Sequence, residues 1–235
     1  MTYYPAIVVF ILAIADWIAA DRKIKALEYF AKPATMLAIL WWIWLSVGLG
    51  GSMVWFTIGA IFCLAGDIFL MIPRNLFILG LVSFLIGHVF YILGLNNTPP
   101  FEHLARLFLA LYIVKPVAIV TAVILVIYLI WLYRKLAGSL KAKGISQLKI
   151  PVLIYAIVIS LMVYSALLSW YQVGWTAAAA LSASIGAVLF FASDSMLAWD
   201  RFLNPIKHAR LKVMVTYHLG QVGIILGAML SIMGR

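Results

Sequence analysis

The chain has 235 residues, of which 66% are hydrophobic and only 10% are charged, and its formal net charge is +10. This composition excludes a water-soluble globular protein and indicates an integral membrane protein. The positive charge does not indicate a nucleic-acid partner, because the basic residues lie in the connections between apolar stretches.

Eight apolar stretches are long enough to cross a hydrocarbon core about 30 Å thick, which requires roughly 20 helical residues. In chain order they cover approximately residues 3–20, 33–49, 53–72, 76–95, 111–133, 151–171, 175–199 and 212–233. Continuous apolar runs favour helices over the alternating pattern of barrel strands. We therefore predict an all-α fold, in which residues 1–235 form a single transmembrane domain, a polytopic bundle of eight helices.

The basic residues alternate between the two ends of these stretches. Fourteen of the 17 fall in every second connection, namely Arg22, Lys23, Lys25, Lys32, Arg74, Arg134, Lys135, Lys141, Lys143, Lys149, Arg201, Lys207, Arg210 and Lys212. By the positive-inside rule, these connections face the cytoplasm and both termini lie on the non-cytoplasmic side. We expect a multi-pass protein of the cell (plasma) membrane.

Several local patterns refine this topology. Pro33 predicts the start of the second helix, because proline favours the first helical position. Residues 134–150 form a polar connection that either lies on anionic headgroups or only fixes the topology. Residues 101–115 either form an interfacial or re-entrant segment or belong to the fifth helix. The small-residue spacing of Gly223 and Gly227 predicts close helix packing, more within the bundle than at a dimer face.

Two carboxylates interrupt apolar helices, Asp67 in "IFCLAGDIFLMI" and Asp194 in "FFASDSMLAW". A charge near the membrane centre costs from about 3 to more than 10 kcal/mol, so such a residue is usually functional or paired. Each acid precedes a predicted cytoplasmic helix end by six residues, which places both roughly 9 Å from that boundary. We interpret them as a catalytic pair in one pocket. The alternative is two structural acids, each hydrogen-bonded to a hydroxyl group or a lysine.

Other polar residues reach the same depth. Lys32 stands at the cytoplasmic mouth, and Tyr217 and Gln221 lie four residues apart on one face of the last helix. With the two acids they can line one polar pocket. Asp16 either joins this pocket or extends its carboxylate towards the boundary, next to Arg22.

His88 is harder to place. A count of residues puts it roughly 20 Å from the cytoplasmic side, so it reaches the pocket only if its helix is tilted or broken. Otherwise it is a buried histidine bonded to a carbonyl group. The remaining histidines and the single cysteine, Cys63, give little support for a metal site, and we predict neither metal nor cofactor.

Five motifs together resemble the YhhN-like lysoplasmalogenase family: "KPATML", "AGDIFLM", "GHVFYI", "FFASDSMLA" and "TYHLGQVGII". The resemblance runs from about residue 32 to 230. It implies hydrolysis of the vinyl ether bond of a lysoplasmalogen, a lysophospholipid, to a fatty aldehyde and a glycerophospho-headgroup. It also implies a site with Asp67 and Asp194 as catalytic residues, and Lys32, His88, Ser193, Tyr217 and Gln221 as substrate-binding residues.

The chemistry of this reaction suits the residues. A vinyl ether is cleaved by protonation of its β-carbon and attack of water on the resulting oxocarbenium ion. Two carboxylates in a poorly solvated pocket can supply the acid and the base. The main alternative is a small proton- or ion-coupled transporter that uses the same acids. A transporter places its site near the midplane, whereas these acids lie towards one side. A purely structural or lipid-scaffolding protein is a third reading, but it does not explain Asp67 and Asp194.

Overall fold

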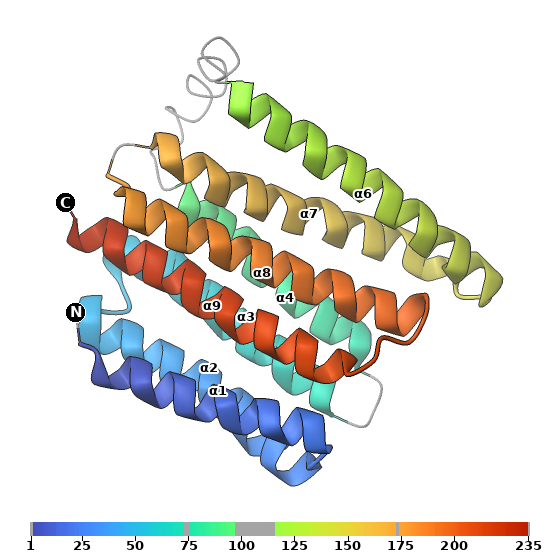
Figure 1. Cartoon of the computed structure of the whole chain (residues 1–235), viewed down its shortest axis with the longest axis horizontal. Coiled ribbons are helices and arrows are strands. Elements are labelled where there is room, and N and C mark those ends of the chain that lie inside the picture. Colours follow the sequence, from blue (N-terminus) through green and yellow to red (C-terminus); the bar gives the residue numbers. More distant parts are fainter. Residues whose placement is uncertain (1, 73–75, 97–115, 173, 235) are drawn as a thin grey trace.

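The computed structural model describes residues 2–72, 76–96, 116–172 and 174–234. Its long helices run side by side as one bundle (Figure 1). They are α1 (Tyr4–Arg22), α2 (Lys25–Val47), α3 (Val54–Met71), α4 (Phe77–Leu95), α6 (Pro116–Ala142), α7 (Lys149–Leu168), α8 (Ala177–Phe202) and α9 (Ala209–Met233). Short 3₁₀ turns, Gly51–Met53, Ser146–Leu148 and Ser169–Tyr171, adjoin α3 and the two ends of α7.

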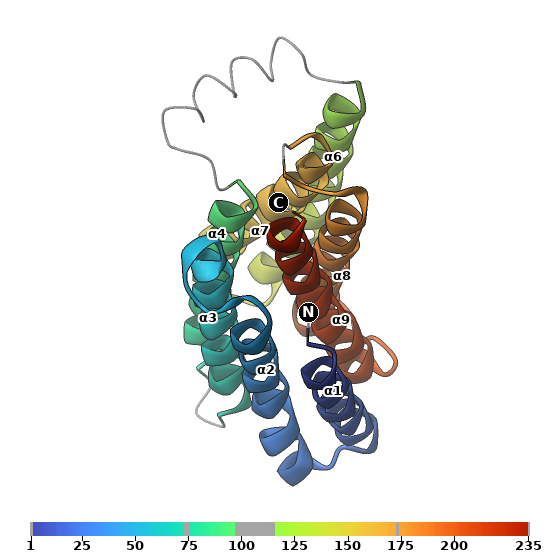
Figure 2. The same ribbon diagram turned by 90° about the vertical axis from the view of Figure 1, so that its left-hand side faces the viewer.

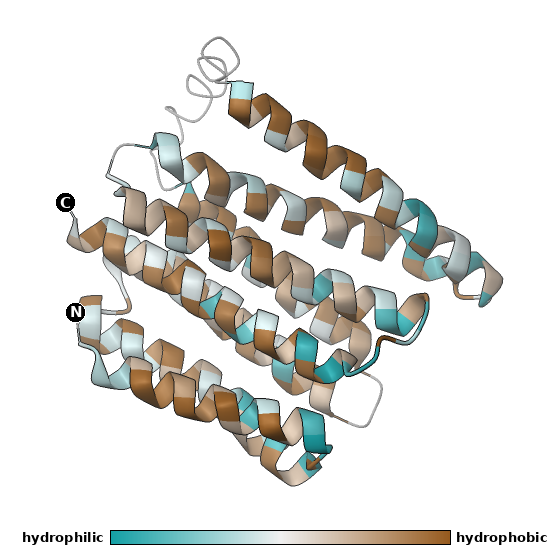
Figure 3. Cartoon of the chain, in the orientation of Figure 1, coloured by the Kyte–Doolittle hydropathy of each residue, from teal (hydrophilic) through white to brown (hydrophobic). Residues whose placement is uncertain are grey.

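Eight helices in the described ranges are long and apolar enough to cross a membrane. This confirms the predicted all-α bundle of eight spans. Both termini lie at the same end of the bundle (Figures 1 and 2). The opposite helix ends are rich in polar residues (Figure 3). We call them the basic end, because they carry Arg22, Lys23, Lys141, Arg201 and Arg210. That this end faces the cytoplasm stays a prediction.

The start of α2 differs from the prediction. The helix begins at Lys25, and Pro33 lies inside it. Proline removes only one helical hydrogen bond, and the preceding residues, which include Ala26, Leu27 and Glu28, are good helix formers. Lys32 is therefore an interior helical residue whose side chain turns into the protein, instead of a residue at the mouth of the bundle.

The connection at residues 134–150 is also more helical than expected. α6 continues to Ala142, because Leu132, Leu136 and Leu140 follow at intervals of four and bury one face of the extended helix. They pack in a cluster with Val152 of α7 and Phe202 of α8. The segment 101–115 lies outside the described residues.

The closest helix pair is α8 and α9. A Cβ atom on Gly223 would lie 2.6 Å from the Cα atom of Gly186, and one on Gly227 would lie 2.7 Å from the backbone nitrogen of Ala183. Only glycine allows two backbones to approach so closely. The spacing of Gly223 and Gly227 therefore packs helices within the bundle, as predicted.

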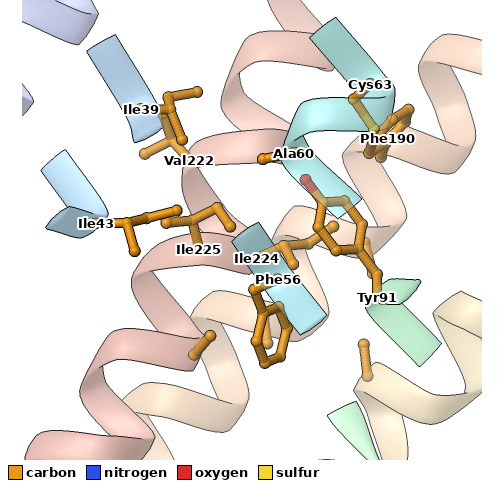
Figure 4. Close-up of a cluster of buried hydrophobic side chains, with 14 of the residues drawn as sticks. Ile39, Ile43, Phe56, Ala60, Cys63, Tyr91, Phe190, Val222, Ile224 and Ile225 are labelled. Atoms are coloured by element: carbon orange, nitrogen blue, oxygen red, sulfur yellow. The ribbon is translucent and has the colours of Figure 1, made fainter. Parts of the chain in front are cut away.

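The main apolar core joins seven helices, α1, α2, α3, α4, α7, α8 and α9. Figure 4 shows part of it, and the labelled side chains come from α2, α3, α4, α8 and α9: Ile39, Ile43, Phe56, Ala60, Cys63, Tyr91, Phe190, Val222, Ile224 and Ile225. α6 lies at the edge of the bundle, where it is the least buried of the eight spans (Figure 1). The polar site described next lies between this core and the basic end.

Candidate active site

Asp67 is the centre of a buried polar group that draws on four helices. The carboxylate lies on α3, and its Oδ1 atom is 3.0 Å from the Nζ atom of Lys32 on α2. The hydroxyl group of Tyr217 on α9 donates to Oδ2 at 2.6 Å. Gln221, one turn later, donates from Nε2 to the Tyr217 oxygen at 3.4 Å and accepts at Oε1 from Tyr91 of α4 at 2.5 Å. Tyr217 and Gln221 thus share one face of α9, as predicted.

Asp194 of α8 has a separate set of partners. The hydroxyl group of Tyr155 on α7 donates to its Oδ2 atom at 2.5 Å. The Nε2 atom of His88 on α4 lies 3.7 Å from the same oxygen, and His88 is fully buried. In the described part of the chain, Lys and Arg residues form no ion pair with this carboxylate.

The position of His88 corrects the depth that the residue count gave it. α4 begins at Phe77 and α8 extends to Phe202, so His88 is 11 residues and Asp194 eight residues from the basic end. At about 1.5 Å per residue, the two side chains differ in depth by only about 5 Å. His88 therefore reaches Asp194 from a continuous helix, and no break in α4 is needed.

Aromatic rings connect the two acids. Phe190 contacts both the His88 ring, with centroids 4.7 Å apart, and the Tyr217 ring, at 5.2 Å. Phe84 also packs on Tyr217, at 5.9 Å. Gly66, directly before Asp67, makes room for Phe84, because a Cβ atom there would lie 2.7 Å from its ring. Phe190 therefore lies between His88, the partner of Asp194, and Tyr217, the partner of Asp67.

An apolar pocket opens beside Asp194. It lies between α3, α4, α6, α7 and α8 and is partly open to the outside of the bundle. Leucine and phenylalanine side chains such as Leu81, Leu132 and Phe202 form most of its lining, and Asp194 is the one acid among its lining residues in the described part of the chain. Asp67 is not part of the lining. The pocket has the chemistry of an alkyl-chain site with one acid at its edge.

Two residues are placed differently from the site that the sequence indicates. The hydroxyl group of Ser193 is buried and donates to the backbone oxygen of Val213, so it holds α8 to α9 and does not face either acid. Asp16 is fully buried and lies 4.0 Å from His218, so its carboxylate does not extend to the membrane boundary. The alternative of a surface acid beside Arg22 is therefore wrong.

Sequence reasoning missed Tyr91, Tyr155 and Glu28. The two tyrosines lie in apolar helices among many other aromatic residues, and no local pattern distinguishes them. Glu28 is buried and ion-paired with Arg210, at 2.6 Å, although it was part of a segment read as a connection. Its spacing of four residues from Lys32 was the available signal, since it places both on one helix face if the helix starts early.

The YhhN family profile matches residues 27–228. The lysoplasmalogenase TMEM86B of Mus musculus is 29% identical over 215 residues, which cover 91% of this chain and 80% of the relative. Its Homo sapiens counterpart is 29% identical, with 92% and 80% covered, and the Bos taurus lysoplasmalogenase TMEM86A is 27% identical, with the same coverage. No solved structure matches the chain significantly. Since the family profile matches most of its length, the chain belongs to the YhhN family.

Proposed function

We propose that this protein hydrolyses the vinyl ether bond of lysoplasmalogens and releases a fatty aldehyde and a glycerophospho-headgroup. The observation that carries the proposal is the position of Asp194, a mostly buried acid in the lining of an apolar pocket, which is linked through the Phe190 ring to a second acid, the buried Asp67. The names of the relatives, which are lysoplasmalogenases, support the same substrate class. They do not favour the transporter alternative.

The two carboxylates have different partners and take different roles. Asp67 is held as a carboxylate by the ammonium group of Lys32, which makes it the base that accepts a proton from water. Among the described residues, the polar partners of Asp194 are the Tyr155 hydroxyl group and the His88 ring, and Asp194 lines the apolar pocket, which makes it the proton donor. This division follows the rule that two acids in one site work as a pair when their environments differ.

The reaction then proceeds in two proton cycles. Asp194 donates its proton to the β-carbon of the vinyl ether, and the double-bond electrons form the new C–H bond. The oxocarbenium ion that remains is attacked by water, and Asp67 takes the water proton, which gives a hemiacetal. When the hemiacetal breaks, its hydroxyl proton returns to Asp194 and Asp67 protonates the departing glycerol oxygen. One water is consumed and both acids regain their starting forms.

The remaining site residues position the substrate and the acids. The alkyl chain lies in the apolar pocket, and the glycerophosphate extends towards the basic end, where Lys32 attracts the phosphate. Tyr217 and Gln221 fix the orientation of Asp67, and His88 and Tyr155 fix that of Asp194. For Ser193 we propose packing instead of substrate binding, because its hydroxyl group is already engaged.

The test uses two lipids that differ only in the bond to the chain. Detergent-purified protein is incubated with a lysoplasmalogen and, separately, with the acyl-ester lysophospholipid of the same headgroup and chain length. We expect free aldehyde from the first and no fatty acid from the second. Folded protein that releases no aldehyde from the lysoplasmalogen contradicts the proposal.

A further inference from the structure

A third acid, Asp16, is buried on α1 and fully shielded from solvent. Neither of its carboxylate oxygens accepts a hydrogen bond from the residues that the structure describes. The nearest ionisable ring is that of His218 on α9, whose Nε2 atom is 4.0 Å from Oδ2. A buried carboxylate without donors is costly. Its retention indicates that a donor outside the protein satisfies it.

The tautomer of His218 is set by its other neighbour. The indole Nε1 of Trp17, which can only donate, lies 3.1 Å from the Nδ1 atom of His218. Nδ1 is therefore an acceptor, and the neutral ring carries its proton on Nε2, on the side of Asp16. The 4.0 Å separation exceeds a hydrogen-bond distance. A small polar group can bridge the two side chains.

Glu28 adds one more oxygen without a partner. Its Oε1 atom accepts from the Nε atom of Arg210 at 2.8 Å and from a terminal guanidinium nitrogen at 2.6 Å. Its Oε2 atom is buried and has no hydrogen bond. Glu28 lies three residues after the start of α2 and Asp16 six residues before the end of α1, so the two acids lie near the same end of this helical hairpin. Together they present three free carboxylate oxygens.

The charges of this region leave one negative charge in excess. Two further buried acids lie in this part of the bundle, and each is paired with a basic residue, Asp67 with Lys32 and Glu28 with Arg210. Among the described residues, no lysine or arginine forms an ion pair with Asp16. The three acids and two bases together carry a net charge of −1 when all are ionised, which one bound monovalent cation would neutralise. Among the described residues, no three His, Cys, Asp or Glu side chains are arranged to hold a metal ion.

We propose that Asp16 and Glu28 form a subsite for the primary ammonium group of an ethanolamine headgroup. The inference rests on the proposed function, since it places the headgroup of the same substrate. Three N–H donors of a primary ammonium match the three free oxygens, and the His218 N–H faces Asp16 beside them. A choline headgroup has no N–H group that could donate to these oxygens.

The order of the sites also fits an amphipathic lipid. The apolar pocket lies on the α6 and α7 side of Asp194, whereas Asp16 and Glu28 belong to α1 and α2 on the far side of the bundle (Figure 2). Asp67 and Lys32 lie between α2 and α3, on the way from one to the other. The alkyl tail would thus lie in the apolar pocket and the ether bond beside Asp194. The phosphate would lie near Lys32, and the ammonium group beside Asp16 and Glu28.

The test compares lysoplasmalogens that have the same alkenyl chain but different headgroups. kcat/KM is measured for lysoplasmalogens that carry ethanolamine, its mono- and dimethyl derivatives, and choline. We expect the wild type to prefer ethanolamine over choline by at least about 10-fold, the scale of one charge-assisted hydrogen bond. Asp16→Asn and Glu28→Gln should reduce this preference to about twofold or less through a higher KM for ethanolamine. Asp21→Asn, which changes an exposed acid of the same helix, should keep it.

A binding measurement separates the subsite from the reaction. Glycerophosphoethanolamine, which has no vinyl ether, should raise the thermal unfolding temperature of wild-type protein and of Asp21→Asn but not that of Asp16→Asn or Glu28→Gln. Such a shift without aldehyde release in any lipid would support the subsite and overturn the hydrolysis. Aldehyde release with the same headgroup preference in wild type, Asp16→Asn and Glu28→Gln would overturn the subsite and leave the hydrolysis standing. Aldehyde release by a wild-type protein that shows no preference for ethanolamine would also overturn the subsite and leave the hydrolysis standing.

Discussion

The Nζ atom of Lys32 lies 3.0 Å from the Oδ1 atom of Asp67, and the two side chains are only 6% and 1% exposed. A pair buried to this degree is bound mainly to itself, because neither charge has water to stabilise it. Lys32 is therefore first the counter-ion of Asp67. If Lys32 also binds a lipid phosphate, it does so while it remains paired with Asp67.

The first prediction follows from this pair. Lys32→Met should lower the free energy of unfolding by about 3–5 kcal/mol, because it leaves a buried carboxylate unpaired. Adding Asp67→Asn should restore much of that loss but no activity. Thermal unfolding in detergent measures the effect, with Lys25→Met, an exposed lysine of the same helix, as the control. A double variant as unstable as Lys32→Met would show that the pair is not the cause.

The second prediction concerns the acids. Asp67→Asn and Asp194→Asn should each lower kcat by at least about 100-fold, the scale of general acid–base catalysis. Since each step of the reaction needs both acids, the double variant should be little worse than the poorer single one. Aldehyde release at saturating lysoplasmalogen measures this. Full turnover in a folded Asp67→Asn protein would mean that this carboxylate serves packing alone.

The third prediction tests the hydroxyl group that orients Asp194. Tyr155→Phe removes the 2.5 Å hydrogen bond and should lower kcat by about 10-fold with little change in KM, because the acid loses its fixed direction. Tyr164→Phe is the matched control, since it changes a tyrosine of the same helix that lines a different pocket. Equal kcat values for the two variants would contradict the role of Tyr155.

The fourth prediction tests the apolar pocket. Ala156→Phe adds a ring to its lining and should reduce kcat/KM more for long-chain than for short-chain lysoplasmalogens, because it shortens the space for the tail. Ile157→Phe places the same ring on the exposed face of α7 and should leave the chain-length profile unchanged. A profile that responds equally to both variants would place the tail elsewhere.

The fifth prediction concerns the contact of α8 and α9. Gly186→Ala puts a Cβ atom 2.4 Å from the backbone nitrogen of Ile224, so the helices must separate. We expect a loss of at least about 1–3 kcal/mol in unfolding free energy. Gly138→Ala, in open space on α6, should instead keep or raise stability by up to about 1 kcal/mol. Equal unfolding temperatures for Gly186→Ala and Gly138→Ala would argue against the close contact of α8 and α9.

The site was predictable to the extent that single residues stand out from their surroundings. Asp67 and Asp194 are visible because charge is rare in an apolar helix, and Tyr217 and Gln221 because their spacing fixes a shared face. The partners of these residues could not be predicted from the sequence. Whether a tyrosine such as Tyr155 meets Asp194 depends on helix rotation and neighbour order, which no short pattern contains.

The class of the protein, the number of its membrane spans and its two unusual acids can be predicted from composition and hydropathy. Long apolar runs force a membrane chain to satisfy its hydrogen bonds within each helix, so composition alone dictates the architecture. Tertiary structure decided which helices are neighbours, and with them that Lys32 pairs with Asp67, that His88 reaches Asp194 and that Asp16 is buried beside His218. These contacts depend on the depth, tilt and rotation of each helix, which packing between helices sets.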